Sequence, residues 1–454
     1  MKLAYKALNN LDGYKCLFWI VIQQIIVASS TYFIIRLMES VNADDGTISY
    51  SYLILFVSSL IFVYIPVSLS HIYMDRYHLS SFRNYINLFA RLNSNRPYLA
   101  HQRYKRIYET WVTNESYIVY KESANVLYEL TSTFLNFSLS IFVICIMLDP
   151  QLLRWYGMAC LVLLISVILF SNQIKKASKD VQLKRKNMSG LVLSVWDNAT
   201  ISNRYNFDLW SSEFSKKYEQ SVASTTKYNY VRSLVSSITV IAAILIVGYG
   251  NTQYIFENVG SSVAISSLIV TLPRQIQVIQ SIFMFFSQAL EVQGISSRLK
   301  GLSNPLTIKN PDLFKHIEMP LISISIDSKE RSFKHPFDAL RYIKSMENGR
   351  ITFRGENGSG KSTLLSYLAT EMGKESFYLP TEHDLFFADS NIINGSDGLR
   401  MIYTIEKISS LKSFRFLILD EWDANLDKIN TIDVSQKIDE VAKEVVVLEV
   451  RHGR

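Results

Sequence analysis

Six long segments with almost no charged residues constrain the fold of this chain more than any other feature. They cover residues 16–35, 48–74, 128–148, 155–174, 233–256 and 261–290. A helix needs about 20 apolar residues to cross a bilayer, and a buried helix of a soluble protein is rarely apolar on all sides for that length. Hydrophobic residues make up 48% of the 454 residues, as expected for a membrane protein with a soluble part. The sequence therefore predicts an all-α transmembrane domain of six helices over residues 1–302.

The connections between these segments differ in charge. Residues 38–49 contain no lysine or arginine, whereas residues 75–127 and 175–232 are rich in both. The positive-inside rule then places both termini and both long connections in the cytoplasm. Because the basic residues lie between apolar segments, we attribute the net charge of +7 to the membrane and expect no nucleic-acid partner. The long connections are predicted to be helices that extend beyond the bilayer.

The three cysteines, Cys16, Cys145 and Cys160, all lie within apolar segments. Their positions favour buried thiols and indicate neither disulfides nor a zinc site. The first apolar segment is too long for the core of a signal peptide, so no cleavable signal is predicted.

A glycine-rich motif lies in the C-terminal third of the chain. Its residues fit G-x-x-x-x-G-K-[ST] and are Gly355, Glu356, Asn357, Gly358, Ser359, Gly360, Lys361, Ser362 and Thr363. A strand over residues 350–353 and a helix over 364–372 are predicted on either side. Backbone N–H groups and the positive end of the helix dipole would then face phosphate oxygens. We expect ATP here, with Lys361 at the β- and γ-phosphates and Ser362 at Mg²⁺.

A second motif follows the apolar residues 416–419. Asp420 and Glu421 come next, where a buried strand would bring Asp420 to Mg²⁺ and Glu421 to the attacking water. Further strands are predicted over residues 321–326 and 445–448, alternating with helices. This pattern predicts a mostly parallel sheet covered on both faces. Residues 303–454 are accordingly predicted to form an α/β P-loop NTPase domain.

Together these features resemble the ABC transporters, specifically the exporter-type half-transporters, over nearly the whole chain. Residues 420–427 resemble the Walker B motif and the D-loop of that family, and His452 falls at the position of its switch histidine. The resemblance implies catalytic roles for Glu421 and His452. Trp422 replaces the common proline, and a similar tryptophan occurs in exporters of cyclic peptides and siderophores, which points to peptide cargo.

The chain also departs from the family pattern. Thr381 stands where the Q-loop glutamine is expected. The signature segment, which would face the ATP of a second subunit, falls on Ser396, Asp397 and Gly398, and only Gly398 matches in register. Since 14 residues lie between Thr381 and Ser396, the helical subdomain is predicted to be shortened. Phe333 is the candidate for the aromatic residue that stacks on the adenine.

The sixth apolar segment contains polar residues near its middle. Arg274 follows Pro273, and Gln277 lies one helical turn further on. A cation in the hydrocarbon region is costly unless it faces a partner or a wet cavity, whereas proline is tolerated there as a kink. One interpretation is that Arg274 and Gln277 line a substrate path. The alternative is that Arg274 lies at a membrane interface.

The resemblance implies a homodimer that binds two ATP molecules and moves cargo by alternating access. The expected cargo is a peptide or another small amphipathic molecule that leaves the cytoplasm. We expect a multi-pass protein of a bacterial inner membrane with a cytoplasmic ATPase domain. Two alternatives stay open: a membrane-bound ATP sensor or regulatory subunit with weak ATPase activity, and an importer on the same fold.

Overall fold

The computed structural model describes residues 2–42, 46–94, 96–100, 102–192, 194–200, 204–308, 315, 317–326, 329–356, 358–381, 383, 385, 387, 397–411, 413–424 and 426–451. The chain divides into two compact units. We call Met1–Arg83 with Tyr117–Gly301 the helical unit, and Asn84–Ser116 with Leu302–Arg454 the sheet unit.

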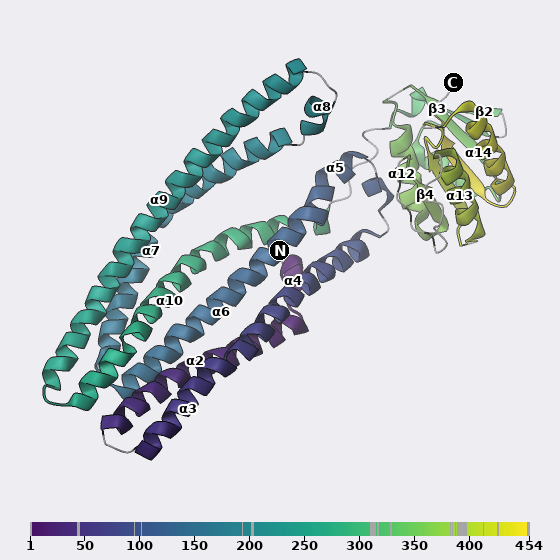
Figure 1. The fold of residues 1–454 in the computed structure, drawn as a ribbon. Coiled ribbons are helices and arrows are strands. Elements are labelled where there is room, and N and C mark those ends of the chain that lie inside the picture. Colours follow the sequence, from purple (N-terminus) through teal and green to yellow (C-terminus); the bar gives the residue numbers. More distant parts are fainter. Residues whose placement is uncertain are drawn as a thin grey trace. The chain divides into compact units, whose positions relative to one another are not determined.

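The helical unit consists mostly of long helices (Figure 1). Its helices are α1 (Lys2–Lys6), α2 (Leu11–Asn42), α3 (Gly46–Phe62), α4 (Tyr64–Asn93), α6 (Ser116–Met147), α7 (Leu152–Val192), α8 (Val195–Ala199), α9 (Arg204–Glu257) and α10 (Ser262–Gly301). Among the described residues, six helical segments are long and apolar enough to cross a membrane. These six overlap the six predicted segments, so the prediction of a multi-pass membrane protein is confirmed.

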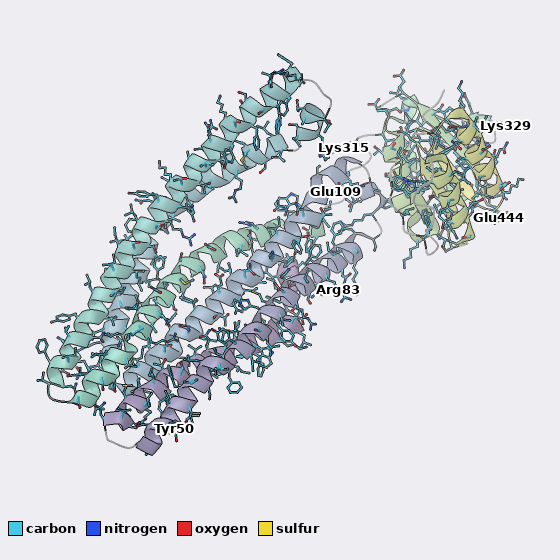
Figure 2. All side chains as sticks on the ribbon, in the orientation of Figure 1. Tyr50, Arg83, Glu109, Lys315, Lys329 and Glu444 are labelled. Carbon is cyan, nitrogen blue, oxygen red and sulfur yellow. The ribbon has the colours of Figure 1, made fainter. Side chains whose placement is uncertain are left out.

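The side chains of α3 show why this unit requires a lipid environment. No residue of α3 is charged, and its apolar side chains point outward, as Tyr50 does in Figure 2. Tyr50 is 67% exposed, and eight further large apolar side chains of α3 are exposed as well: Ile48, Leu53, Ile54, Leu55, Val57, Leu60, Ile61 and Phe62. A patch of this size in water marks a surface that is covered by something else, and hydrocarbon is the solvent that fits it.

The predicted segment 48–74 is one span in length but two helices in structure. The break between α3 and α4 falls at Val63, three residues before Pro66. Proline has no N–H, and its ring clashes with the carbonyl of the residue four positions earlier, which is Phe62. The helix resumes at once, since Val67 N donates to Val63 O at 3.2 Å.

The two longest helices, α7 and α9, pack against each other, and α8 lies at one end of the pair (Figure 1). At a rise of about 1.5 Å per residue, the 54 residues of α9 extend roughly 80 Å, far more than the ~30 Å of a bilayer core. The second long connection is therefore helical, as predicted, and α9 is long enough to extend beyond a bilayer. At the opposite end of the pair, Ile144, Leu163, Ala243 and Ile282 form a buried core between α6, α7, α9 and α10.

Within its described residues, the sheet unit has six strands in the order β2-β1-β3-β6-β5-β4. The strands are β1 (Ile322–Ile326), β2 (Lys329–Arg331), β3 (Gly349–Gly355), β4 (Ser376–Leu379), β5 (Phe416–Asp420) and β6 (Val446–Val450). β3, β6, β5 and β4 are parallel, and β1 pairs antiparallel with β2 and β3. The sheet is thus mostly parallel, as predicted.

Helices cover both faces of this sheet. On one face α11 (Pro336–Lys344) and α12 (Lys361–Met372) bury residues such as Leu340 and Leu365 against Phe416 and Ile418 of β5. On the other face α13 (Asp397–Ser410) and α14 (Lys428–Val441) pack on the alternate residues of β5, Leu417 and Leu419. Burial on both faces explains why β5 is a continuous apolar run.

Part of the first long connection belongs to the sheet unit. It comprises the end of α4, the short helix η1 (Pro97–Ala100), α5 (Gln102–Thr110) and a single π-helical turn, Trp111–Glu115. η1 packs against α12. The arginine Arg96 donates from Nη1 to Ile308 O at 2.6 Å, and Tyr85 donates from its hydroxyl to Leu302 O at 3.1 Å. These bonds fix the connection to the residues that begin the C-terminal part of the chain.

The described residues between β4 and β5 contain one helix, α13, and residues 388–396 lie outside the described part. Within the described residues this agrees with a helical subdomain that is much reduced.

Candidate functional site

The Gly355–Thr363 loop joins β3 to α12, as the motif predicts. Gly358 and Gly360 both have φ of +90°, a conformation that favours glycine over residues with a side chain. Gly355 is required for a different reason. A Cβ atom on it would lie 2.4 Å from Leu321 O, because β1 approaches closely here. Asn357 lies outside the described residues.

Lys361 is the first residue of α12 and is 8% exposed. Its Nζ donates to Gly355 O at 2.8 Å and to Glu356 O at 2.9 Å. The loop backbone thus surrounds the ammonium group at the positive end of the helix dipole. A buried cation at a helix N-terminus attracts anions.

Ser362 on α12 is hydrogen-bonded to Asp420 at the end of β5. Ser362 Oγ donates to Asp420 Oδ1 at 2.8 Å, and the carboxylate is 4% exposed. Its second oxygen, Oδ2, accepts from the Tyr378 hydroxyl at 3.0 Å. Burial, followed by the negative charge of Asp420, raises the pKa of Tyr378 well above its ordinary value, so the hydroxyl keeps its proton and remains a donor.

Glu421 follows directly at the end of β5 with φ of +47°, the left-handed region that non-glycine residues rarely adopt. Its N–H donates to Val450 O at 3.0 Å, and its carbonyl accepts from Ala424 N at 3.1 Å. Thr381, at the position of the expected Q-loop glutamine, donates from Oγ1 to Asp420 O at 3.0 Å. Both residues are therefore tied to neighbouring strands by short bonds.

The donor set of this edge fits a nucleotide with Mg²⁺. Mg²⁺ takes oxygen ligands, and a serine hydroxyl whose proton points at a carboxylate keeps its lone pairs for a metal. Ser359, inside the loop, is 2% exposed, and its Oγ has no hydrogen-bond partner among the described residues. A buried hydroxyl without a partner is costly, and a phosphate oxygen would satisfy it.

The other predicted site residues are placed less directly. Phe333 packs on the α11–α12 core and contacts the Tyr342 ring at 5.7 Å between centroids, so its described role is packing. Asp397 and Gly398 begin α13, and the Asp397 side chain lies outside the described part of the structure. Ser396 and His452 lie outside the described residues.

Two residues, Tyr378 and Glu449, were not identified from the sequence, and neither was the bond from Thr381 to Asp420 O. Of these, only Glu449 left a signal in the sequence. It interrupts the apolar strand β6, and a carboxylate in a buried strand needs a partner.

Polar side chains also meet inside the helical unit. Arg274 on α10 donates from Nη2 to Ser140 Oγ on α6 at 2.7 Å, and from Nη1 to Gln277 Oε1 at 3.0 Å. Its buried Nε has no partner among the described residues. Further along the same two helices, Ser281 donates to Asn136 at 3.3 Å.

A third contact, Gln288 to Glu129, continues this row. We call the row of Ser140, Asn136 and Glu129 on α6 and Arg274, Ser281 and Gln288 on α10 the α6–α10 seam. Its positions are four and seven residues apart, which places them on one face of each helix. The structure thus brings Arg274 and Gln277 together and joins them to a polar row, while their place on a substrate path stays a prediction.

Comparison with known proteins gives similarity in structure but not in sequence. No family model and no curated protein sequence matches the chain. Among solved structures, the chain is similar to one described as a bacterial Atm1-family ABC exporter with ATP bound. The TM-score is 0.59 and the identity 11%, over 96% of this chain and 90% of the other. At this level of identity the similarity concerns the fold alone: the chain has the same overall fold as that structure.

Proposed function

We propose that this chain is an ATP-driven membrane transporter of the exporter type. One observation carries the proposal: the bond between Ser362 and Asp420, 2.8 Å long, lies beside the buried Lys361 at the N-terminus of α12. This cation, hydroxyl and carboxylate are the groups that a Mg-nucleotide requires. They occur in a chain whose described residues include six helices fit to cross a membrane.

In this proposal Lys361 exchanges its two carbonyl partners for the β- and γ-phosphates. The N–H groups of the Gly355–Thr363 loop and the Ser359 hydroxyl take further phosphate oxygens. Ser362 would hold Mg²⁺, and Asp420 would orient the Ser362 hydroxyl through the hydrogen bond between them. Bound ATP supplies the phosphoanhydride bond whose hydrolysis drives the cycle.

Glu421 is proposed as the group that accepts a proton from the attacking water. Its place at the end of β5, next to Asp420, supports this role. His452 is proposed as a contact of the γ-phosphate, on the resemblance of its sequence position alone. Ser396, Asp397 and Gly398 are proposed to face the ATP of a second copy, which makes the working form a homodimer.

The α6–α10 seam supports a polar path through the helical unit. Arg274 has no carboxylate partner among the described residues, and its hydrogen-bond acceptors Ser140 and Gln277 are both neutral. An unneutralised cation in a membrane span costs several kcal/mol, so a function is the better explanation. We propose that Arg274 and Gln277 contact cargo, a peptide or small amphipathic molecule that carries an anionic group.

The test is transport in inside-out membrane vesicles or liposomes with the purified protein. ATP-dependent uptake of candidate peptides encoded beside the gene is expected, and Lys361→Ala should abolish it. ATP hydrolysis without transport of any peptide would leave the nucleotide site standing and refute the peptide cargo. Uptake in right-side-out vesicles instead would indicate import and refute the direction of transport.

A second candidate is a membrane-bound ATP sensor or regulatory subunit. The observation that favours it is the weak signature sequence at Ser396–Gly398, together with the single helix α13 described between β4 and β5. Steady ATP turnover in a reconstituted bilayer separates the two, because a sensor needs binding but not repeated hydrolysis.

A further inference from the structure

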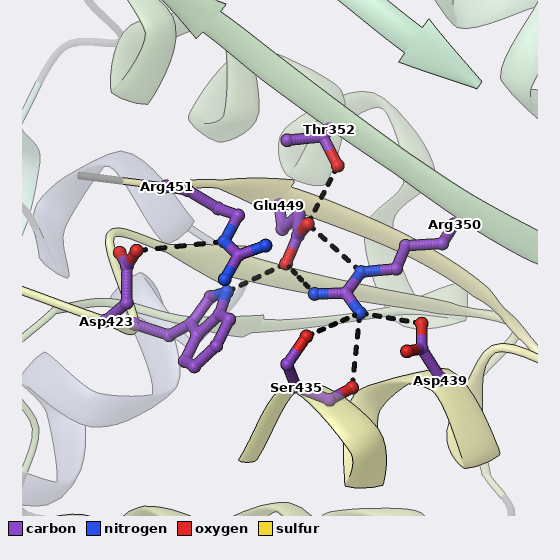
Figure 3. A network of polar contacts seen from close by, with 8 residues as sticks. Arg350, Thr352, Asp423, Ser435, Asp439, Glu449 and Arg451 are labelled. Carbon is purple, nitrogen blue, oxygen red and sulfur yellow. Dashed lines mark hydrogen bonds and ion pairs between the residues drawn. The ribbon is translucent and has the colours of Figure 1, made fainter. Parts of the chain in front are cut away.

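A buried carboxylate holds four hydrogen bonds directly behind the end of β5. Glu449 on β6 is 1% exposed. Its Oε1 accepts from Arg350 Nε at 3.0 Å and from Thr352 Oγ1 at 2.8 Å, and its Oε2 accepts from Arg350 Nη2 at 2.7 Å and from Trp422 Nε1 at 2.8 Å (Figure 3). All of these residues belong to the sheet unit.

Arg350 neutralises this carboxylate and ties it to α14. Its Nη1 donates to Asp439 Oδ1 at 2.7 Å and to the main-chain O and Oγ of Ser435. Burial alone would lower the pKa of Arg350, but the hydrogen bonds and charges of Glu449 and Asp439 outweigh it and raise the pKa. The fork of Arg350 and the hydroxyl of Thr352 give Glu449 three bonds without Trp422. The indole bond is therefore not needed to neutralise the carboxylate.

The position of Trp422 in the chain gives the fourth bond its meaning. Trp422 follows Glu421, whose φ of +47° is an unfavourable conformation that surrounding contacts must hold. Two consecutive residues of β6 hold two consecutive residues of this turn. Val450 O accepts from Glu421 N at 3.0 Å, and Glu449 Oε2 accepts from the Trp422 indole at 2.8 Å.

A second contact holds the face of the indole ring. The Arg451 guanidinium lies over the Trp422 ring at 5.2 Å, and its Nε lies 3.7 Å from Asp423 Oδ2. The ring is thus fixed at its edge by Glu449 and at its face by Arg451. With the indole fixed, the peptide between Glu421 and Trp422 has little freedom to rotate.

We propose that Trp422, anchored by Glu449 and Arg350, is a positioning residue that keeps Glu421 in its left-handed conformation and so directs its carboxylate. This inference rests on the proposed ATPase function. It assigns to Trp422 a role in turnover that acts through Glu421 and not through contact with nucleotide.

The first test uses two variants that each remove one donor to Glu449. Trp422→Phe removes the indole N–H, and the matched control Thr352→Val removes a donor to Oε1 while leaving the Trp422 bond to Oε2. We expect Trp422→Phe to lower kcat by at least about tenfold with KM for ATP unchanged, since a hydrogen bond to a charged group is lost. Thr352→Val should leave kcat unchanged. An equal fall of kcat in both variants would mean that the network serves only stability and would overturn the proposal.

The second test repeats Trp422→Phe in a Glu421→Gln background. A residue that acts only through Glu421 has nothing further to lose there, so residual turnover should not fall again. A second fall of similar size would refute the assignment. If Trp422→Phe does not yield folded protein, Arg451→Leu, at a position that is 27% exposed, releases the ring face and takes its place in both tests.

A third measurement does not depend on activity. Hydrogen exchange over residues 416–426 should be faster in Trp422→Phe than in Thr352→Val, because the hydrogen bond from Glu421 N–H to Val450 O is weakened. Unchanged exchange there would refute the positioning role. If the unmodified protein shows no ATP turnover, the proposed function fails, while this measurement still decides whether Trp422 holds Glu421.

Discussion

The hydroxyl of Tyr378 offers the sharpest test of the metal site. Tyr378→Phe removes the donor to Asp420 Oδ2 and leaves the ring in place. Since Asp420 is 4% exposed, water cannot easily replace that donor. The carboxylate then gains by rotating toward another partner, which weakens the 2.8 Å bond that orients Ser362.

Two effects of this change oppose each other. Losing a neutral donor leaves one carboxylate oxygen without a hydrogen-bond partner, which would favour a cation. Losing its fixed orientation disfavours the metal, and removal of such outer partners typically costs about 10–100-fold in metal affinity. The lost bond to a charged acceptor, about 1.5–3 kcal/mol, agrees with that range. We therefore expect orientation to prevail and the Mg²⁺ concentration for half-maximal turnover to rise at least about tenfold.

The assay is ATP turnover against Mg²⁺ concentration, with nucleotide binding measured in the absence of Mg²⁺. Binding without Mg²⁺ should be unchanged, because Tyr378 does not belong to the Gly355–Thr363 loop. Tyr342→Phe, on α11 and in contact with Phe333, is the matched control. If the Mg²⁺ concentration for half-maximal turnover falls or stays the same in Tyr378→Phe, the reasoning is refuted.

Three further predictions concern the residues identified from the sequence. Lys361→Ala should abolish tight ATP binding, measured with a fluorescent nucleotide, because it removes the charge paired with the phosphates; the exposed Lys443→Ala is the control, and unchanged affinity in Lys361→Ala would contradict the loop assignment. Glu421→Gln should keep ATP binding and lower turnover by at least about 10²-fold; full turnover in this variant would exclude Glu421 as the base. Arg274→Ala should leave basal ATPase activity intact and alter transport. A cysteine at position 274, with the native cysteines removed, should react with a water-soluble thiol reagent. No labelling in either nucleotide state would exclude a water-accessible substrate path at this position.

The sequence predicted the features that depend on local pattern. The six spans follow from runs of apolar residues, and β5 follows from burial on both sheet faces. The loop before α12 was predictable because glycine spacing, Lys361 and Ser362 act together in one motif. Even the break at Val63 has a local cause, in Pro66.

What the sequence did not reveal depends on distant residues meeting. The bond between Tyr378 and Asp420 joins residues 42 positions apart, and that between Arg274 and Ser140 joins residues 134 apart. In neither pair does the sequence around one residue indicate which residue is its partner. Glu449 is intermediate, because its burial could be predicted from β6, but its choice of Arg350 and Trp422 follows only from strand order.

Because Thr381 replaces the Q-loop glutamine, another element must transmit structural changes from the nucleotide site. The Thr381 side chain is short, and its hydroxyl is engaged with Asp420 O at 3.0 Å. It is therefore not free to make the further contacts that a longer glutamine side chain could make at this position. Within the sheet unit α12 is the better candidate. It carries Lys361 at its N-terminus, while Ala369 and Gly373 at its other end line a hollow with Pro97 and Ala100 of η1. We therefore expect nucleotide binding to shift α12 and, through this contact, to displace η1 before other elements.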